Sequence, residues 1–226
     1  MKNVVIVGAG LGLGLSLAKK FGDNGFRVAV ISRNPEKLSI IISELEKLSI
    51  EARSFVADVT DLAALKQTFQ AIIKELGSID VLEFSPYAGW DKFTHVLETT
   101  PQSVLEQINS YLLPAVLSVN EVLPDMINRG SGAFLFTTGI SAMFPLPFVG
   151  NGGIVMSGIR NYATSLHNEL KDKGVFVGHL SIGTMIQAGT EGDPDVIAET
   201  WYNLYDKQEH FEEVFPLGFD PSNFPN

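Results

Sequence analysis

The chain has no cysteine, which excludes disulfide bonds and thiolate metal ligands. Positive charge is also scarce, because 16 lysines and arginines stand against 26 aspartates and glutamates, for a net charge of −10. No basic cluster appears, so nucleic acid and membrane surfaces are not expected partners. No run of 18 apolar residues exists, and the apolar stretch after Lys2 lacks a small-residue cleavage pattern. We therefore expect a cytoplasmic protein.

Two common catalytic patterns are missing as well. The chain contains no G-x-S-x-G segment, the turn that presents the nucleophile of many hydrolases. The four histidines are scattered singly, and no close spacing of histidine, aspartate and glutamate predicts a metal site.

Apolar runs alternate with segments of helical period along the whole chain. This alternation predicts an α/β fold: a doubly wound parallel sheet of six or seven strands with helices on both faces, in a single domain over residues 1–226. A proline-rich tail over residues 215–226 is expected to be irregular. The predicted strands are Val4–Val7, Arg27–Ile31, Ala52–Val56, Val81–Phe84, Ala133–Thr137, Val175–Leu180 and, more weakly, Glu212–Phe215. The predicted helices are Leu13–Gly22, Pro35–Leu48, Asp61–Leu76, Pro101–Asn128, Gly153–Lys173 and Pro194–Asp206.

Helix starts are marked by side chains that can cap the first turn. Asn34, Thr60 and Thr100 each stand just before a predicted helix, and each can accept a hydrogen bond from a free backbone N–H group.

The most informative segment follows the first predicted strand. Glycine occupies positions 8, 10, 12 and 14, with Leu11 and Leu13 between them, and the next helix begins there. Glycine lets the backbone turn sharply and approach a ligand, while the free N–H groups of a helix start favour an anion. We expect Gly8, Gly10, Leu11, Gly12, Leu13 and Gly14 to cradle a phosphate of a nucleotide. The alternative is a tight strand–helix turn with no ligand.

The glycine spacing narrows the class of protein. The fingerprint G-x-G-x-x-G fails in every frame, but G-x-x-x-G-x-G fits at Gly8, Gly12 and Gly14. That variant resembles the short-chain dehydrogenase/reductase family. The resemblance implies an NAD(P)-binding Rossmann fold and hydride transfer between the cofactor and a carbonyl or alcohol substrate.

The end of the second predicted strand indicates which cofactor to expect. An acid here would bind the ribose 2′-hydroxyl of NAD, whereas the chain has Ser32 and Arg33. Arg33 can pair with a 2′-phosphate, so NADP (NADPH) is the expected cofactor; an ordinary surface arginine is the alternative. After the third strand, Asp58 and Val59 match the family segment that contacts adenine. The alternative for Asp58 is that it merely caps the next helix.

Other matches are weaker. Asn109 corresponds to the asparagine that supports the family's active site, and Thr138 falls where the family has a catalytic serine. Ile182 and Gly183 resemble the proline–glycine segment that contacts nicotinamide, and Ser85 lies in the segment after the fourth strand.

The chain departs from the family pattern at the catalytic pair. The family uses a tyrosine as general acid or base and a lysine four residues later that lowers the tyrosine pKa. Here Gly152 and Met156 fall at those positions, or Asn151 and Val155 if the alignment shifts by one residue, and no Y-x-x-x-K occurs anywhere. The family's N-N-A-G segment is also replaced. Tyr87, on the loop after the fourth strand, is a candidate replacement for the proton donor.

The substrate lid that the family carries is expected to be short, because only Met185 to Asp193 separate Thr184, at the end of the proline–glycine-like segment, from Pro194 of the last helix. Two functions therefore remain open: an oxidoreductase with atypical or weak catalysis, or a non-catalytic NADP-binding sensor or complex partner. The resemblance also implies a homodimer or homotetramer built on the two longest helices, where Gly153, Ser157 and Gly158 would allow close approach.

Overall fold

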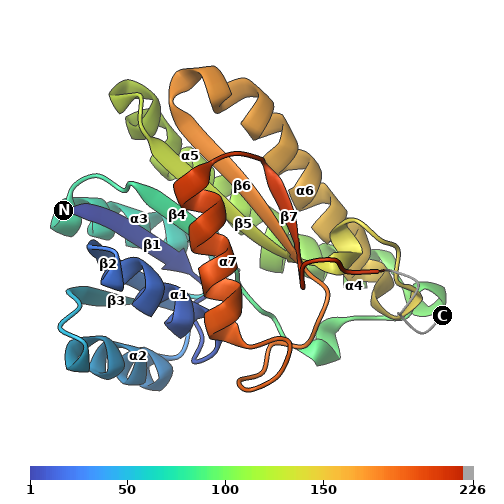
Figure 1. Ribbon diagram of the computed structural model, residues 1–226. Helices are drawn as coiled ribbons and strands as arrows, with labels where there is room; N and C mark the ends of the chain where they lie inside the picture. The colour runs from blue at the N-terminus through green and yellow to red at the C-terminus, as the bar shows by residue number, and fades with distance from the viewer. Residues whose placement is uncertain (221–226) are drawn as a thin grey trace.

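The computed structural model describes residues 1–220 and contains one parallel sheet of seven strands (Figure 1). The strand order is β3-β2-β1-β4-β5-β6-β7, with every neighbouring pair parallel. The chain turns back between β1 and β4, and a crevice opens there at the carboxyl ends of the strands. The strands are β1 (Lys2–Val7), β2 (Phe26–Ser32), β3 (Ala52–Val56), β4 (Val81–Phe84), β5 (Gly132–Gly139), β6 (Val175–Ile182) and β7 (Glu212–Phe215).

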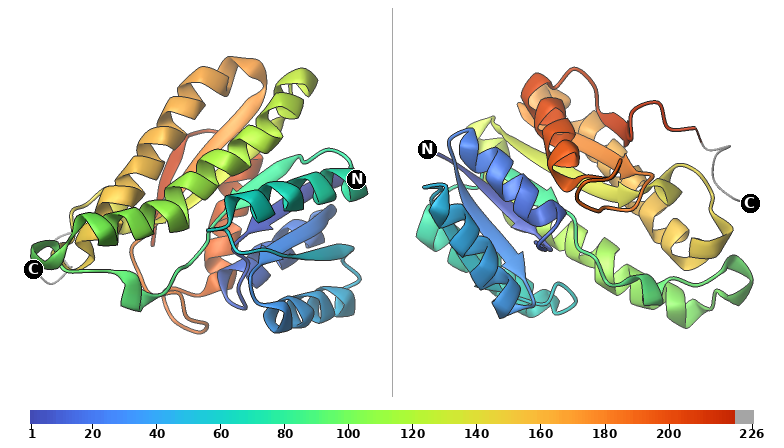
Figure 2. Two further views of the ribbon diagram at one scale, coloured as in Figure 1. Left: turned by 180° about the vertical axis from the view of Figure 1, so that it is seen from behind. Right: turned by 60° about the horizontal axis from the view of Figure 1, so that its bottom comes forward.

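Helices cover both faces of the sheet (Figure 2). Helices α1, α2 and α7 pack on one face through one apolar core, and α3, α5 and α6 pack on the other through a second core. The central strands bury side chains on both faces, as expected for a parallel sheet. The helices are α1 (Leu13–Asp23), α2 (Pro35–Lys47), α3 (Leu62–Leu76), α4 (Pro101–Gln107), α5 (Leu113–Arg129), α6 (Gly150–Leu170) and α7 (Pro194–Lys207).

The predicted fold class is confirmed, and all seven predicted strands are present with ends displaced by two residues at most. The predicted helix over Pro101–Asn128 is helical throughout but not regular. A π-helical segment, Ile108–Leu112, lies between α4 and α5. Pro114, two residues after this segment, has no N–H to donate to the preceding turn, so the regular hydrogen-bond ladder is interrupted there.

Two of the three predicted caps are confirmed. Asn34 accepts from Lys37 N, and Thr100 forms a capping box with Ser103. The prediction for Thr60 is wrong, because Asp61 caps α3 by accepting from Ala64 N.

The two ends of α6 and the segment from Phe215 onward differ from the prediction. Helix α6 begins at Gly150 rather than Gly153, and its last predicted turn, Lys171–Lys173, is a 3-10 turn. Phe215 belongs to β7, and the Phe219 ring packs 5.7 Å from that of Phe144. Residues 221–226 of the predicted tail lie outside the described part of the chain.

Candidate functional site

The glycine-rich turn joins β1 to α1 beside the crevice. Gly8 has a φ of +88°, and a Cβ there would lie 2.3 Å from the Pro86 backbone. A Cβ on Gly14 would lie 2.7 Å from the backbone of Ala9. These two glycines are therefore needed for packing within the protein.

The other two glycines face open space. A Cβ on Gly10 would meet nothing within 4 Å, and one on Gly12 would meet only Ile186, at 4.0 Å. No side chain caps the start of α1, and its first turn carries no acid. The turn thus presents free N–H groups and an uncompensated helix dipole to the crevice, which suits a phosphate. Leu11 is exposed beside it, while Leu13 is buried.

A shallow, solvent-open hollow continues from this turn across the ends of β2 and β3. Its wall brings together most of the residues predicted for the adenosine half of the cofactor. The lining is Gly8, Ser32, Arg33, Ala57, Asp58, Val59, Thr60, Pro86, Tyr87, Ala88 and Ser110.

Asp58 and Arg33 give this hollow its charge. Asp58 Oδ1 accepts hydrogen bonds from Thr60 N (2.9 Å) and Thr60 Oγ1 (2.8 Å). The bond from Thr60 N is the main cause that lowers the Asp58 pKa, with a smaller contribution from the charge of Arg33. Arg33 is exposed and makes no direct hydrogen bond or ion pair within residues 1–220. Its guanidinium is available to a ligand.

Tyr87 lies in this hollow and not among the polar residues at the end of β5. It is 60% exposed, and burial together with the charge of Asp91 raises its pKa. A phenol with a raised pKa is less suited to proton transfer near neutral pH. Asn109 is exposed on the π-helical segment, whereas its neighbour Ser110 lines the hollow and Tyr111 Oη accepts from Ala88 N.

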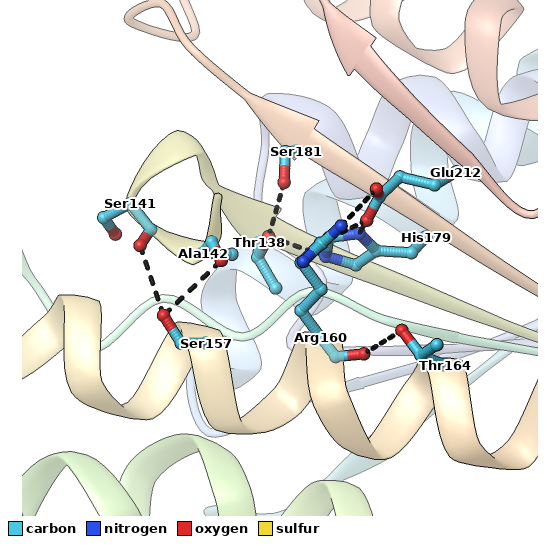
Figure 3. Close-up of polar contacts among 9 residues, drawn as sticks. All are labelled: Thr138, Ser141, Ala142, Ser157, Arg160, Thr164, His179, Ser181 and Glu212. Atoms are coloured by element: carbon cyan, nitrogen blue, oxygen red, sulfur yellow. Dashed lines mark hydrogen bonds and ion pairs between the residues drawn. The ribbon is translucent and has the colours of Figure 1, made fainter. Parts of the chain in front are cut away.

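Thr138 is buried near the end of β5 and belongs to a polar array that crosses three strands (Figure 3). Its Oγ1 lies 2.9 Å from His179 Nε2 and 3.2 Å from Ser181 Oγ. His179 Nδ1 lies 2.8 Å from Glu212 Oε1, and Arg160 donates two hydrogen bonds to the Glu212 carboxylate. The Thr138 hydroxyl is thus fully engaged inside the protein.

The pKa values in this array follow from burial and pairing. Burial lowers the His179 pKa more than the bond to Glu212 raises it, so the imidazole stays neutral near pH 7. For Glu212, burial raises the pKa, but the hydrogen bonds from His179 and Arg160, the charge of Arg160 and, in acid, the charge of protonated His179 together outweigh it and bring the pKa to about 2. Sequence reasoning missed both residues; the one available signal was a histidine inside an otherwise apolar strand.

The Phe93 ring packs on Gly152, one of the two positions expected for the family tyrosine. A Cβ on Gly152 would lie 2.6 Å from the Phe93 ring, and one on Gly150 would lie 2.6 Å from Val96 Cα. Asn151 fixes this arrangement, since its side chain accepts from Thr94 N and donates to Lys92 O. The segment after β4 therefore packs directly on the start of α6. Arg160, the nearest cation on α6, is paired with Glu212.

The remaining predicted residues lie at the ends of β4 and β6. Ser85 N donates to Val7 O, which joins the end of β4 to β1. The Ile182 side chain belongs to the α1/α7 core, so only its backbone faces the strand end. Gly183 donates to Phe215 O, and a Cβ there would lie 2.6 Å from the Phe219 ring.

The short loop Met185–Asp193 folds back on itself. Gln187 N donates to Gly192 O, and Ile186 reaches toward Gly12 of the phosphate turn. Over residues 1–220, no cluster of three metal-binding side chains occurs. In the same part of the chain, no helix combines the length and apolarity that crossing a membrane requires.

Comparisons with known proteins agree with this geometry. Among curated proteins, the chain is 27% identical to the oxidoreductase asL5 of Sarocladium schorii, over 94% of this chain and 82% of that protein. It is 23% identical to a 3-oxoacyl-[acyl-carrier-protein] reductase of Staphylococcus aureus, over 88% of this chain and 80% of the reductase.

Solved structures share the fold. A metagenomic short-chain oxidoreductase in complex with NADP superposes with a TM-score of 0.83 at 24% identity, over 94% of this chain and 95% of the other. An alcohol dehydrogenase from Thermococcus sibiricus, complexed with 5-hydroxy-NADP, gives a TM-score of 0.84 at 22% identity, over 95% of this chain and 96% of the other. The sequence profile of the short chain dehydrogenase family matches residues 2–192, and the chain therefore belongs to that family.

Proposed function

We propose that this chain binds NADP(H) across the crevice between β1 and β4, and that its hydride transfer to a carbonyl or alcohol substrate is weak. The phosphate turn would hold the pyrophosphate. Ser32 and Arg33 would hold the 2′-phosphate, and Asp58 with Val59 would contact the adenine. The NADP and 5-hydroxy-NADP carried by two structures of the same fold support this choice of ligand.

The observation that carries the proposal is the unpaired guanidinium of Arg33 in the hollow beside Asp58. Had Arg33 only a structural role, we would expect a carboxylate or carbonyl partner within the protein. A charged hydrogen bond of this kind contributes about 1.5–3 kcal/mol, or about 10- to 150-fold in affinity.

Titration of NADPH and NADH by fluorescence tests this proposal. The protein should bind NADPH more tightly, and Arg33→Ala should weaken NADPH binding by at least about tenfold while changing NADH binding little. Arg53→Ala is the control, because it removes an exposed arginine from the amino-terminal part of β3, outside the lining of the hollow, where Arg53 pairs with Glu75. Equal affinities for the two cofactors, unchanged by Arg33→Ala, would contradict the proposal.

A non-catalytic role as an NADP-binding sensor or complex partner is the second candidate. It is favoured by the Phe93 ring at Gly152 and by the absence of a lysine at Met156. Without a phenol tuned by a nearby cation, about 10²–10⁴ in rate is lost. Absorbance of NADPH with a panel of carbonyl compounds should show very slow loss or none. Turnover of 1 per second or more would favour the oxidoreductase and make Thr138→Val and Tyr87→Phe the first variants to study.

We also propose that the chain forms a homodimer or homotetramer through the helices around α5 and α6. Leu105, Leu113 and Ile154 are exposed on this side of the molecule. The small residues Gly153 and Ser157 approach Ser141 of the same chain, so these exposed leucine and isoleucine side chains are the better candidates for contact. Light scattering at micromolar concentration should give at least twice the monomer mass of 24.6 kDa, and a monomer would contradict the proposal.

A further inference from the structure

A buried chain of hydrogen bonds ends at Ser85, directly after the carboxyl end of β4. Glu83 lies in β4 with no exposed surface, on the face covered by α1 and α7. Trp201 Nε1 donates to Thr137 Oγ1 (2.8 Å), and Thr137 Oγ1 donates to Glu83 Oε1 (2.8 Å). Ser85 Oγ lies 2.8 Å from Glu83 Oε2. The four side chains thus connect α7 to the end of β4.

The hydrogen positions in this chain follow from chemistry. An indole N–H can only donate, so the Thr137 oxygen accepts from Trp201 and its single hydrogen points to Glu83 Oε1. No ion pair reaches Glu83 within residues 1–220, and a fully buried carboxyl without a counter-charge favours its neutral form. With Oε1 accepting from Thr137, we assign the proton of the neutral acid to Oε2, the oxygen that faces Ser85.

This assignment determines what the Ser85 hydroxyl can do. When Glu83 is neutral, Oε2–H donates to Ser85 Oγ, and the Ser85 hydrogen is free to donate to a third group. When Glu83 is ionised, the Ser85 hydroxyl has to donate to the carboxylate. The protonation state of one buried acid therefore decides whether Ser85 is a hydrogen-bond donor.

Ser85 lies where the carboxyl ends of β1 and β4 meet, beside the proposed cofactor site. It follows β4 directly, its N–H bonds to Val7 at the end of β1, and the next residue, Pro86, packs against Gly8 of the phosphate turn. Ser85 is half-buried rather than enclosed. In doubly wound sheets a dinucleotide lies across this switch point.

We propose that Glu83 and Ser85 form a proton-linked donor of the cofactor site, in which neutral Glu83 directs the Ser85 hydroxyl toward a phosphate or ribose oxygen of the bound dinucleotide. The inference rests on the NADP(H) binding proposed above. Ionised Glu83 removes that donor and adds negative charge beneath an anionic ligand. Both effects act in the same direction, so the cofactor favours the protonated acid.

Burial raises the pKa of Glu83 to about 8, and the hydrogen bonds from Thr137 and Ser85 offset burial only in part. No charged side chain of α1, α7 or the neighbouring strands contributes to this pKa; on these helices Lys20 pairs with Glu199 instead. All five tyrosines have pKa values raised above 10, so none titrates between pH 7 and 9.

The sign of the pH dependence follows by linkage. A ligand that prefers protonated Glu83 raises the Glu83 pKa in the complex, and its affinity falls as pH rises above the pKa of the free protein. If the complex has a pKa about one unit higher, NADPH affinity falls about fivefold or more from pH 7.5 to 9.5.

The decisive comparison is NADPH affinity from pH 7 to 9.5 for the wild type and for Glu83→Gln. The glutamine amide accepts from Thr137 and donates to Ser85 at every pH, so it imitates the neutral acid. We expect Glu83→Gln to match the wild type at pH 7 and to stay within about twofold across the range. Glu75→Gln, which removes a surface carboxyl, should keep the wild-type pH dependence. Ser85→Ala should bind several-fold more weakly at pH 7.

Proton uptake gives a second, independent measurement. Calorimetry at pH 8 in two buffers of different ionisation enthalpy should show that the wild type takes up a fraction of a proton on binding NADPH. Glu83→Gln should take up none, and should that variant not fold, Ser85→Ala should take up less than the wild type. NADPH affinity that is independent of pH, or equal pH slopes in the wild type and Glu83→Gln, would overturn the inference alone. Failure of the wild type to bind NADPH would overturn the proposed function, and this inference with it.

Discussion

The carboxyl of Glu83 is buried in a parallel sheet without a counter-charge, and this lowers the free energy of unfolding at neutral and higher pH. Between pH 4.5 and about 8 the folded protein keeps a proton on Glu83 that the unfolded chain releases. The free energy of unfolding should therefore fall by up to about 1.4 kcal/mol for each pH unit in this window.

Glu83→Gln should remove that loss, because a glutamine does not titrate. We expect the variant to unfold near the wild-type denaturant midpoint at pH 5 and to be about 2–5 kcal/mol more stable than the wild type at pH 8. Urea unfolding across this range, with Glu75→Gln as control, measures the difference. A constant difference at all pH values would mean that Glu83 is ionised in the folded protein.

The position of some polar residues in the fold could be predicted from the sequence, and that of others could not. The placement of Arg33 and Asp58 on one hollow was predictable because each lies within two residues of a strand end, and parallel strands bring their carboxyl ends to one edge. His179 and Glu212 were not, because 33 residues separate them and only the pairing of β6 with β7 brings them together. The role of Tyr87 depends on the path of an irregular loop, which no periodicity encodes.

The glycines of the turn between β1 and α1 have two different roles, close packing within the protein and open space for a ligand. A Cβ at position 14 would press on Ala9, whereas one at position 10 would enter open space. We expect Gly14→Ala to lower the free energy of unfolding by about 1–3 kcal/mol, as overpacking does, and Gly10→Ala to change it by less than about 0.5 kcal/mol. Gly10→Ala should nevertheless weaken NADPH binding, because its methyl group occupies the space beside the free N–H groups. Urea unfolding and fluorescence titration of both variants test the pair.

Strand β7 is an edge strand held by the array around Glu212. The lowered pKa of Glu212, about 2 against 4.5, stabilises the folded state above pH 4.5, and this stabilisation is lost as pH falls toward 2. Glu212→Gln leaves Arg160 without its carboxylate and should cost about 2–4 kcal/mol at pH 7. The cost should shrink in acid. Unfolding of wild type and variant at pH 7 and pH 3 measures it, and an equal cost at both would contradict the assignment.

At the scale of the whole molecule, ligand binding and folding are linked. NADPH at 100 times its Kd should stabilise the protein by about 2.7 kcal/mol and raise Tm by about 5–10 °C for a chain of this size. NADH at the same concentration should raise Tm less, because it lacks the phosphate that Arg33 would bind. Thermal unfolding with each cofactor checks this, and equal shifts would argue against a role for the 2′-phosphate.

The positions of the strands, the parallel sheet with helices on both faces and the place of the glycine-rich turn could be predicted, because hydrophobic period and glycine placement are local properties. The π-helical segment between α4 and α5 could not be predicted, because it depends on how the helix packs around Pro114, which cannot donate a backbone hydrogen bond. Nor could the packing of Phe93 on Gly152, which joins residues far apart in sequence.

That packing constrains how the chain could regain a tyrosine. A tyrosine at position 152 would collide with the Phe93 ring, so Gly152→Tyr with Met156→Lys would be harmful while Phe93 stays in place. Phe93→Ala alone would open a cavity and also be harmful. Each first step is unfavourable in the absence of the other. A tyrosine at position 152 therefore requires the loss of the Phe93 ring at the same time, and neither substitution is tolerated well without the other.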